Sequence, residues 1–466
     1  MTSVRSLLQQ SNGNEWLPNL GLVLLLLIAS CSTPKKVIPP SQPVPPKTES
    51  KPEVFNPTTG KYETATPANT RVDTIIWKDS GKEPYIQDKS NNPVGSKNDP
   101  GHRYRISLLL PLSDEDIGKD MSTEGSEKYF HYYAGVKMGA EKIKDSLFSV
   151  DINIIDLKPS MAALNNILKD PKVATSDLIL GPLRRDQISE TAKFAREKNI
   201  LMAAPWNSFR TIENLSANYI LLKASLPTHC ETLAKYIMSQ NKFNDICLVG
   251  REKSTALMNY FENEFQRLNN GVPVMIARST VKDDFKFSDD YKYLDTTKSV
   301  YVVTEYEEPD VVFNFLRHLN QMRKTKEITV IGMPSWLDYS RDFMSLFSQL
   351  KVVISSSTFV DINSDNVIAF RKSFFQEYQN FPLKEAYEGY DAIIYLSKML
   401  NEFGKGFNYY GDVHTYSGIS TDYKLEKVIE ANTPVDDRLN ANNIECIENK
   451  ALYLLRYDQF RFNKIQ

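Results

Sequence analysis

The sequence predicts an α/β protein built from two lobes, each with a parallel β-sheet, joined by a hinge. From Tyr104 onward, short apolar runs alternate with amphipathic segments of helical length, the pattern of strand–helix–strand units around parallel sheets. This alternation comes in two similar blocks that meet near 221–228. The chain has 466 residues, more than one domain usually needs. We therefore expect two lobes with a cleft between them.

The composition excludes several kinds of function. Lys and Arg number 56 and Asp and Glu number 58, for a net charge of −2, which excludes a strongly basic surface for nucleic acid. Hydrophobic residues make up 41% and aromatic residues 11%, enough for a sizeable core. No apolar run reaches the roughly 20 residues of a membrane-spanning helix. We expect a mainly globular protein that binds no nucleic acid.

The N-terminal segment resembles the signal peptide of bacterial lipoproteins. Its apolar run, 22–29, is too short to span a bilayer and suits a secretory signal. The motif Ile28-Ala29-Ser30-Cys31 follows at once and is similar to a lipobox. In lipoproteins the chain is cleaved before this cysteine, which is then acylated, so the resemblance implies removal of 1–30 and a lipid anchor at Cys31. A chance cysteine after an apolar stretch is the alternative.

The composition changes directly after this motif. Residues 32–70 are rich in Pro, Ser, Thr and Lys, a composition that favours extended polyproline II over a packed core. We predict that 31–103 is a disordered tether with one apolar island at 72–77; a tether of about 70 residues reaches on the order of 200 Å. Ser32, with no acidic residue beside Cys31, resembles outer-membrane lipoproteins, which implies an outer-membrane anchor. The sequence leaves open which side of that membrane the head faces, and the periplasmic side is our expectation.

The first block of the head begins with a continuous apolar run, the mark of a strand buried on both faces. Strands are expected at 106–110, 150–155, 178–182 and 200–204, and helices at 129–140, 161–168 and 187–198. Gly135 and Gly139 lie four residues apart in the first helix. Because glycine inside a helix costs about 1 kcal/mol, we expect this helix to pack closely against a sheet.

The second block repeats the alternation. Strands are expected at 246–250, 272–276, 300–304, 328–332 and 352–354, and helices at 229–240, 257–268, 311–322, 367–378 and 385–403, with a closing hairpin around 452–457. We assign 104–222 and 360–410 to the first lobe. The second lobe is expected to take 228–356 and 415–466.

Over residues 104–466, the order of elements resembles the type I periplasmic-binding-protein fold of the Leu/Ile/Val-binding proteins. The most specific motifs are SLLLPLS at 107–113, YYAG at 132–135, DLILGP at 177–182 and EGYDA at 388–392. The resemblance implies two Rossmann-like lobes, three hinge crossings, and a ligand held between lobes that close on it.

Two departures bear on the ligand. Amino-acid-binding members place Ser or Thr hydroxyls after the Gly-Pro turn and after the next strand, whereas here Gly181-Pro182 is followed by Leu183-Arg184-Arg185 and Pro205 by Trp206-Asn207. Amino-acid binding is therefore in doubt. A lipid-anchored head also resembles the C-terminal domain of LpoA-type lipoproteins, which activate peptidoglycan synthases through protein contact.

Ligands of open α/β sheets bind at the carboxyl ends of strands. Arg184 is a candidate for pairing with a carboxylate or phosphate, Glu305 for holding an amine, and Trp206 or Trp336 for stacking on a ring. The full candidate set is Ser113, Arg184, Trp206, Asn207, Ser208, Glu305, Tyr306 and Trp336. The alternatives are a solvated loop for Arg184, hinge-side packing for Trp206, and an exposed acidic loop at 305–308. Asp391 is expected to be a hydrogen-bond acceptor on its helix.

No catalytic motif is present: there is no Gly-x-Ser-x-Gly, no His-Glu-x-x-His and no phosphate-binding loop. The histidines show no metal-ligand spacing, and His131 and His229 are expected at the surface or as helix caps. Cys247 is expected to be buried and inert, whereas a Cys230–Cys446 disulfide is conceivable. We therefore expect no enzyme, cofactor or metal.

Two functions remain open at this point. The first is a noncatalytic, lipid-anchored envelope protein whose two lobes close on a small polar ligand. The alternative is an LpoA-like interaction protein that regulates a peptidoglycan synthase or another cell-wall enzyme. The long tether favours the alternative, because nutrient capture gains little from such reach.

Overall fold

The structure is a computed structural model in which 53–56, 61–64, 102–112, 123–144, 150–158, 160–210, 212, 215–281, 295–305, 307–339, 341–409, 414–429 and 443–465 are described. The predicted lipid site Cys31, the apolar island at 72–77, and the site candidates Ser113 and Tyr306 lie outside these residues. The chain divides into two compact units, 1–80 and 81–466. Each unit is described by itself.

The first unit contains one strand pair. Strands β1 (Glu53–Asn56) and β2 (Lys61–Thr64) are antiparallel, with Glu53 opposite Thr64 and Asn56 opposite Lys61. Val54, Phe55 and Tyr62 are residue types that favour strands. These strands fall inside 31–103, the range predicted to be a tether, and the rest of that range up to 101 lies outside the described residues.

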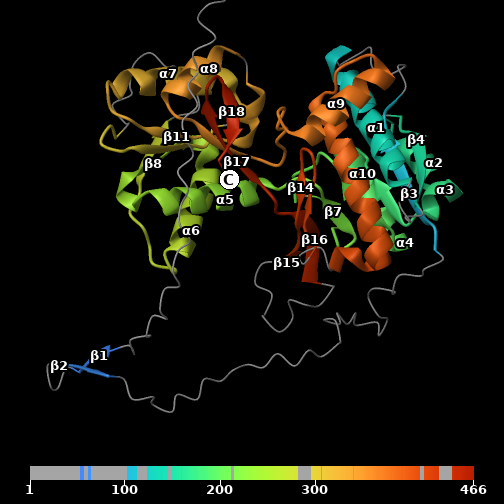
Figure 1. Ribbon diagram of the computed structural model, residues 1–466, viewed down its shortest axis with the longest axis horizontal. Coiled ribbons are helices and arrows are strands. Elements are labelled where there is room, and N and C mark those ends of the chain that lie inside the picture. The colour runs from blue at the N-terminus through green and yellow to red at the C-terminus, as the bar shows by residue number, and fades with distance from the viewer. Residues whose placement is uncertain are drawn as a thin grey trace, which may run out of the picture. The chain divides into compact units, whose positions relative to one another are not determined.

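Among the described residues, the second unit contains two seven-stranded sheets and a two-stranded antiparallel pair, β13 (Tyr416–Ser417) with β14 (Asp422–Tyr423) (Figure 1). The sheet of the first lobe has the order β15-β16-β7-β6-β5-β3-β4. It is parallel except at β15, which pairs antiparallel with β16. Its strands are β3 (Tyr104–Leu110), β4 (Val150–Asp156), β5 (Leu178–Leu180), β6 (Leu201–Ala204), β7 (Tyr219–Leu221), β15 (Leu425–Ile429) and β16 (Ile444–Asn449).

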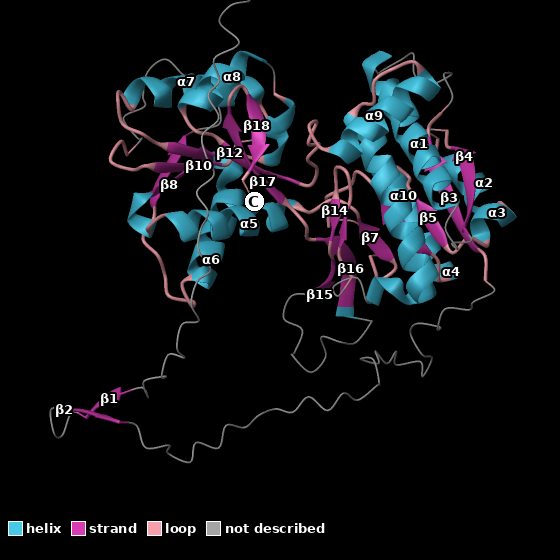
Figure 2. Cartoon of the chain, in the orientation of Figure 1, coloured by secondary structure: helices cyan, strands magenta, loops and turns pink. Residues whose placement is uncertain are grey.

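Helices cover both faces of this first sheet (Figure 2). Alternate residues of β3 face opposite cores, as the two-residue period of a strand requires. Leu108 packs in the core that α1 (Thr123–Lys144) and α10 (Lys384–Phe403) cover. Leu109 packs in the core that α2 (Met161–Leu168) and α4 (Arg185–Lys198) cover. Helices α3 (Pro171–Ala174) and α9 (Asp365–Tyr378) complete the lobe.

The sheet of the second lobe has the order β18-β17-β12-β11-β10-β8-β9. Strands β8 to β12 are parallel, and β17 and β18 are antiparallel. The strands are β8 (Ile246–Arg251), β9 (Ala277–Val281), β10 (Val300–Val303), β11 (Thr329–Ile331), β12 (Val353–Ser356), β17 (Tyr453–Asp458) and β18 (Arg461–Lys464). The helices are α5 (Leu226–Gln240), α6 (Thr255–Leu268), α7 (Pro309–Met322) and α8 (Met344–Gln349).

The predicted fold class is confirmed, with two differences in detail. The strand expected at 272–276 lies at Ala277–Val281, because Gly271 takes a left-handed φ of 80° and Pro273 cannot donate a ladder hydrogen bond. The division between lobes also differs, since Ile447 of β16 pairs with Ile220 of β7. Strands β15 and β16 thus belong to the first lobe, and the prediction that 415–466 belongs to the second lobe is wrong for these two strands.

The chain crosses between the sheets at 222–225, 357–364 and 450–452. Side chains tie these crossings to one another. Ser357 Oγ accepts a hydrogen bond from the Ala224 N–H at 3.2 Å. Asn449 Nδ2 donates to the Leu222 carbonyl at 3.2 Å, and Asn449 Oδ1 accepts from the Ala451 N–H at 3.1 Å. Side-chain-to-backbone hydrogen bonds therefore fix the three crossings of the hinge to one another.

Helices α1 and α10 pack backbone to backbone. A Cβ on Gly135 would overlap the Ala386 carbonyl oxygen, and a Cβ on Gly389 would overlap the Tyr132 carbonyl oxygen. The close approach predicted from Gly135 and Gly139 is present, but the partner is helix α10 and not a sheet. Among the described residues, no helix combines the length and apolar character needed to cross a bilayer.

Candidate functional site

A cavity of about 330 Å³ is lined by residues of both lobes, and we call it the interlobe pocket. The first lobe and its crossing contribute Ser208, Lys223, Lys384 and Glu388, and the second lobe contributes Met333, Pro334, Ser335, Leu337 and Asp338. The crossing residues 356–358 (Ser-Ser-Thr) add hydroxyl groups. Two crossings and the ends of β7 and β12 thus bring polar groups together at one place.

Two ion pairs define the charge of the interlobe pocket. Lys384 Nζ of α10 lies 2.7 Å from Asp338 Oδ1, which joins the first lobe to the second. Both side chains are largely exposed, at 46% and 66%, so this pair contributes at most about 1 kcal/mol. Lys223 Nζ lies 3.0 Å from Glu388 Oε1, whose side chain is only 7% exposed. The Lys384–Asp338 pair between the lobes can therefore break at little cost in free energy. The Lys223–Glu388 pair is more buried and is expected to stay formed.

His229 lies against this pocket in a buried position. Its Nδ1 is 2.8 Å from Ser355 Oγ, and burial lowers the pKa of His229 to about 4. The ring is therefore neutral at pH 7. His131 is also buried, and its Nδ1 accepts a hydrogen bond from the Leu383 N–H at 3.1 Å. The predicted surface or cap role is wrong for both histidines, because each ring fills space between two elements.

The three candidates after β6 separate in the structure. Trp206 stacks on Tyr129 at 5.6 Å between ring centroids and donates from Nε1 to Glu388 Oε2 at 2.9 Å, so the hinge-packing alternative holds for it. Asn207 is buried and donates from Nδ2 to Tyr219 Oη at 2.7 Å. Ser208 alone of the three lines the interlobe pocket.

Arg184 is the residue that precedes α4. Its guanidinium reaches both oxygens of Asp186, with Nη2 3.2 Å from Oδ2, and its side chain is 48% exposed. The Asp186 hydrogen bond raises the pKa of Arg184. Arg184 is thus a surface residue with its own carboxylate partner, and it does not line the interlobe pocket.

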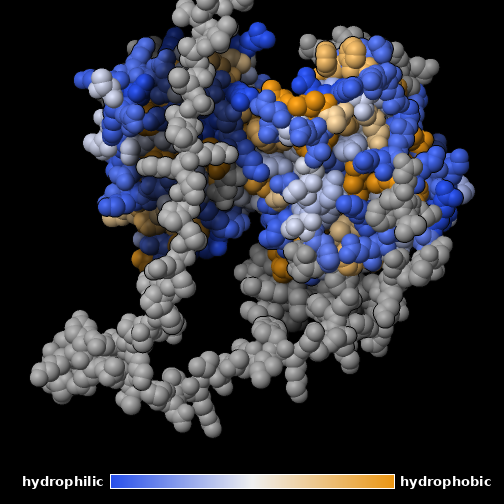
Figure 3. Space-filling view, viewed as in Figure 1, coloured by the Kyte–Doolittle hydropathy of each residue, from blue (hydrophilic) through white to orange (hydrophobic). Residues whose placement is uncertain are grey.

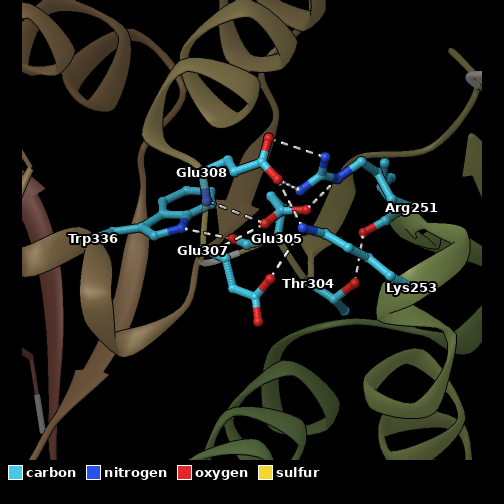
Figure 4. Close-up of polar contacts among 8 residues, drawn as sticks. Arg251, Lys253, Thr304, Glu305, Glu307, Glu308 and Trp336 are labelled. Atoms are coloured by element: carbon cyan, nitrogen blue, oxygen red, sulfur yellow. Dashed lines mark hydrogen bonds and ion pairs between the residues drawn. The ribbon is translucent and has the colours of Figure 1, made fainter. Parts of the chain in front are cut away.

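Glu305 follows β10 and is buried in a network of charges (Figure 4). Arg251 Nε at the end of β8 donates to Glu305 Oε2 at 2.6 Å, and Arg251 Nη2 lies 2.9 Å from Glu308 Oε1. Lys253 Nζ lies 2.8 Å from Glu308 and 3.0 Å from Glu307. The predicted amine-holding role of Glu305 is wrong in this arrangement, because the Arg251 guanidinium already occupies its carboxylate.

Trp336 lies beneath that network and is fully buried. Its Nε1 donates to the Glu305 carbonyl at 3.0 Å (Figure 4). Its ring stacks on Phe347 at 5.9 Å between centroids. Trp336 is therefore part of the second-lobe core, and the predicted stacking role toward a ligand is wrong.

Several residues of the interlobe pocket are not among the candidates predicted from the sequence. The run Ser355-Ser356-Ser357-Thr358 directly follows an apolar strand, and that position was a usable signal because ligands bind where parallel strands end. Lys384 and Asp338 carried no such signal. They are 46 residues apart and meet only through the packing of the two lobes.

The cysteines and acidic residues point to no further chemistry in the described parts of the chain. Cys230, Cys247 and Cys446 are free and buried, so the conceivable Cys230–Cys446 disulfide is absent and the burial predicted for Cys247 is confirmed. Burial raises the pKa of each thiol to about 12. Among these described residues, no group of three or more His, Cys, Asp or Glu is placed to hold a metal ion.

Comparison with known proteins identifies the fold. No protein-family model matches the chain, and no curated protein sequence matches it. Its structure is similar to an ABC transporter substrate-binding protein from Desulfitobacterium hafniense in complex with Leu, with a TM-score of 0.51 and 13% identity over 78% of this chain and 100% of that chain. A periplasmic ligand-binding protein of a branched-chain amino acid ABC transporter from Burkholderia xenovorans matches with a TM-score of 0.52 and 13% identity over 78% and 95%.

A structure from Rhodospirillum rubrum, described as a branched-chain amino acid ABC transporter, matches with a TM-score of 0.56 and 14% identity over 78% of this chain and 100% of that one. These proteins share with this chain two α/β lobes joined by a hinge. The chain therefore has the fold of the type I periplasmic binding proteins, as its motifs predict.

Proposed function

We propose that this protein is a noncatalytic, lipid-anchored ligand-binding protein of the cell envelope, whose lobes close on a small polar ligand in the interlobe pocket. The observation that carries the proposal is the pocket itself. Its walls come from both lobes, and the weak Lys384–Asp338 pair joins them. A volume of about 330 Å³ lies at the lower end of the range for small-molecule sites.

The lining of the pocket narrows the ligand class. Lys223 and Glu388 stay paired with each other. Lys384 offers a cation and Asp338 a carboxylate, because their mutual pair is exposed and weak, and residues 356–358 offer hydroxyl groups. Such mixed polar groups suit a small zwitterionic or hydroxyl-bearing compound. The D. hafniense protein holds Leu, but Arg184 and Glu305 of this chain already have internal charge partners. We therefore expect the ligand to be held through the pocket residues named here.

Closure follows from the energetics of the hinge. The buried contacts of the crossings hold each lobe, while the exposed Lys384–Asp338 pair adds little to stability. A ligand that pairs with Lys384 or Asp338 and reaches the hydroxyl groups of the crossing contacts both walls at once. Its binding energy then favours the closed arrangement.

A thermal-shift screen of the full chain, purified in detergent, against amino acids, sugars and muropeptides tests this function. At about 100 times its Kd, a ligand adds about 2.7 kcal/mol of stability, which corresponds to a rise of a few degrees in Tm. Lys384→Ala is expected to lower affinity for the hit at least about tenfold with little change in stability. Lys351→Ala, which removes an exposed pair with Glu327, is the matched control. A hit that binds Lys384→Ala as tightly as wild type contradicts the proposed site.

The second candidate is an LpoA-like regulator of a cell-wall enzyme, and one observation favours it. Beside the interlobe pocket, the space among Tyr132, Pro205, Thr358 and Tyr423 retains a cavity of only about 10 Å³. Trp206 and the Lys223–Glu388 pair fill this part of the hinge. If no compound shifts Tm and a pull-down from envelope extract captures a peptidoglycan synthase, the regulator replaces the ligand-binding function.

Lipid anchoring at Cys31 has its own test. Cys31→Ala is expected to leave unprocessed precursor that no longer partitions with membranes, because a thioether-linked lipid requires the thiol. Ser32→Ala is the control and is expected to be processed like wild type. Density fractionation, with protease added to intact cells, checks the outer membrane and the periplasmic face. Unchanged processing and membrane partition in Cys31→Ala contradict the anchor.

A further inference from the structure

A second cavity lies on the first lobe and shares no lining residue with the interlobe pocket. We call it the α1–α9–α10 groove, after the three helices that form its walls. The segment 416–419 closes one side, and the volume is about 690 Å³, compared with about 330 Å³ for the interlobe pocket. In Figure 1 the three helices are labelled on the first lobe, with β14 next to α10.

Aromatic rings line this groove. Phe370 of α9 and Tyr390 of α10 contact each other edge to face at 4.9 Å between centroids. Tyr416, from β13 (Tyr416–Ser417), supplies a further ring, and Lys398 Nζ lies 5.1 Å from its centroid. Tyr390 and Tyr416 are half-buried, so part of each side chain remains accessible to the apolar C–H groups of a sugar or another ring compound.

Polar groups accompany the rings. Ser373, Ser417 and Asn366 line the groove and are exposed. On the face of the molecule that Figure 3 shows, hydrophobic residues lie among hydrophilic ones over the first lobe. A lining that alternates ring faces with hydroxyl and amide groups suits a ligand that is itself both apolar and hydroxyl-bearing.

Two cations stand at the groove without a carboxylate partner among the described residues. Lys142 of α1 and Lys398 of α10 are both exposed. The one carboxylate of the lining, Glu141, lies 4.0 Å from Lys137. The groove therefore presents net positive charge beside its aromatic rings, which favours an anionic ligand.

The wall at 418–421 is held rigid from behind. Asp391 is fully buried, and its carboxylate accepts hydrogen bonds from the N–H groups of Ile419 at 2.9 Å, Ser420 at 2.8 Å and Thr421 at 2.9 Å. The hydrogen-bonding role expected for Asp391 is thus confirmed. A Cβ on Gly418 would overlap the Asp391 carboxylate. A wall fixed in this way is pre-organised, as a binding site requires.

We propose that the α1–α9–α10 groove is a second binding site, for an acidic sugar whose ring packs on Tyr416 and Tyr390 and whose carboxylate pairs with Lys142 and Lys398. The site acts independently of the interlobe pocket. A protein with both sites holds a small ligand at the hinge and an acidic glycan on the outside of its first lobe.

Calorimetric titration of the full chain with N-acetylmuramic acid tests the proposal, with N-acetylglucosamine as the neutral probe of similar shape. We expect the acidic probe to bind at least about tenfold more tightly than the neutral one, a difference of about 1.4 kcal/mol. Lys142→Ala together with Lys398→Ala is expected to remove that preference. Tyr416→Ala is expected to weaken both probes, and Tyr416→Phe, which keeps the ring face, is expected to retain binding.

Lys384→Ala, in the interlobe pocket, is the matched control and is expected to bind the acidic probe like wild type. Circular dichroism checks that each variant folds. Equal affinity for the two probes, binding that survives loss of both lysines, or no binding of either probe at millimolar concentration overturns the second site. Loss of binding in Lys384→Ala alone assigns the probe to the interlobe pocket and also overturns it.

Discussion

Replacing Glu448 with alanine is expected to lower the free energy of unfolding by about 3–5 kcal/mol, because it removes one member of a buried charge network. Glu448 lies near the end of β16 and its side chain is fully buried. Its carboxylate accepts from Ser225 N–H at 2.8 Å and from Thr228 Oγ1 at 2.5 Å, both at the start of α5. One side chain of the first lobe thus satisfies the first turn of a helix in the second.

Two cations complete this network. Arg210 Nε donates to Glu448 Oε2 at 2.8 Å, and Lys450 Nζ lies 3.1 Å from the same oxygen. Without Glu448, both cations and the helix N-terminus lose their common acceptor. Glu426 faces Glu448 across the β15–β16 pair but forms an exposed pair with Lys424. Glu426→Ala is therefore the control and is expected to change stability by less than about 1 kcal/mol.

The same network makes stability depend on pH. Burial raises the pKa of Glu448, but Lys450, Arg210 and the hydrogen bonds outweigh it, so that the pKa lies below 4.5. A carboxylate with a lowered pKa in the folded state contributes stability above its unfolded pKa and loses it as pH falls through the folded value. Urea unfolding monitored by circular dichroism is expected to show Glu448→Gln approaching wild type below pH 4.5. Equal stability of wild type and Glu448→Ala at pH 7 contradicts this account of the hinge.

Gly135→Ala is the second substitution with a large expected effect. The added methyl group improves helix propensity by up to about 1 kcal/mol, but it meets the Ala386 carbonyl of α10. A backbone carbonyl cannot rotate away as a side chain can, so helices α1 and α10 must move apart to relieve the overlap. We expect a net loss of about 2–3 kcal/mol or more in the free energy of unfolding. Gly389→Ala is expected to act alike, because its methyl group meets the Tyr132 carbonyl.

Thermal unfolding of Gly135→Ala, Gly389→Ala and an exposed control on the same helix, Glu141→Ala, measures this effect. The control is expected to stay within about 0.5 kcal/mol of wild type. Because both glycines serve one contact, the double variant is expected to lose less than the sum of the single losses. A stabilised Gly135→Ala contradicts the close packing of α1 and α10.

Local patterns predict most of the fold. Continuous apolar runs such as 106–110 and 246–250 predict buried strands, because amphipathic segments of helical length alternate with them. The structure has β3 and β8 at these positions. The partners of these elements are harder to predict. Nothing local distinguishes a helix from a sheet as the neighbour of Gly135, and nothing local places β16 beside β7.

The candidate site shows the same limit more strongly. The position of a residue at the carboxyl end of a strand predicts the region of the site, and Ser208 does line the interlobe pocket. Whether a charged side chain is free to bind a ligand depends on partners far along the chain. Arg251, 54 residues before Glu305, pairs with the Glu305 carboxylate. A local pattern shows that Glu305 is acidic, but only the packed lobe shows that its carboxylate is already paired.

The central claim, that the lobes close on a ligand in the interlobe pocket, is tested most directly by the distance between them. Spin labels on introduced cysteines at the exposed Lys193 of α4 and Arg317 of α7 report this distance, since the native Cys230, Cys247 and Cys446 are buried. We predict that a saturating screen hit shortens the distance in the full chain and not in the chain with Lys384→Ala. A distance unchanged by every compound that raises Tm would contradict closure on a ligand.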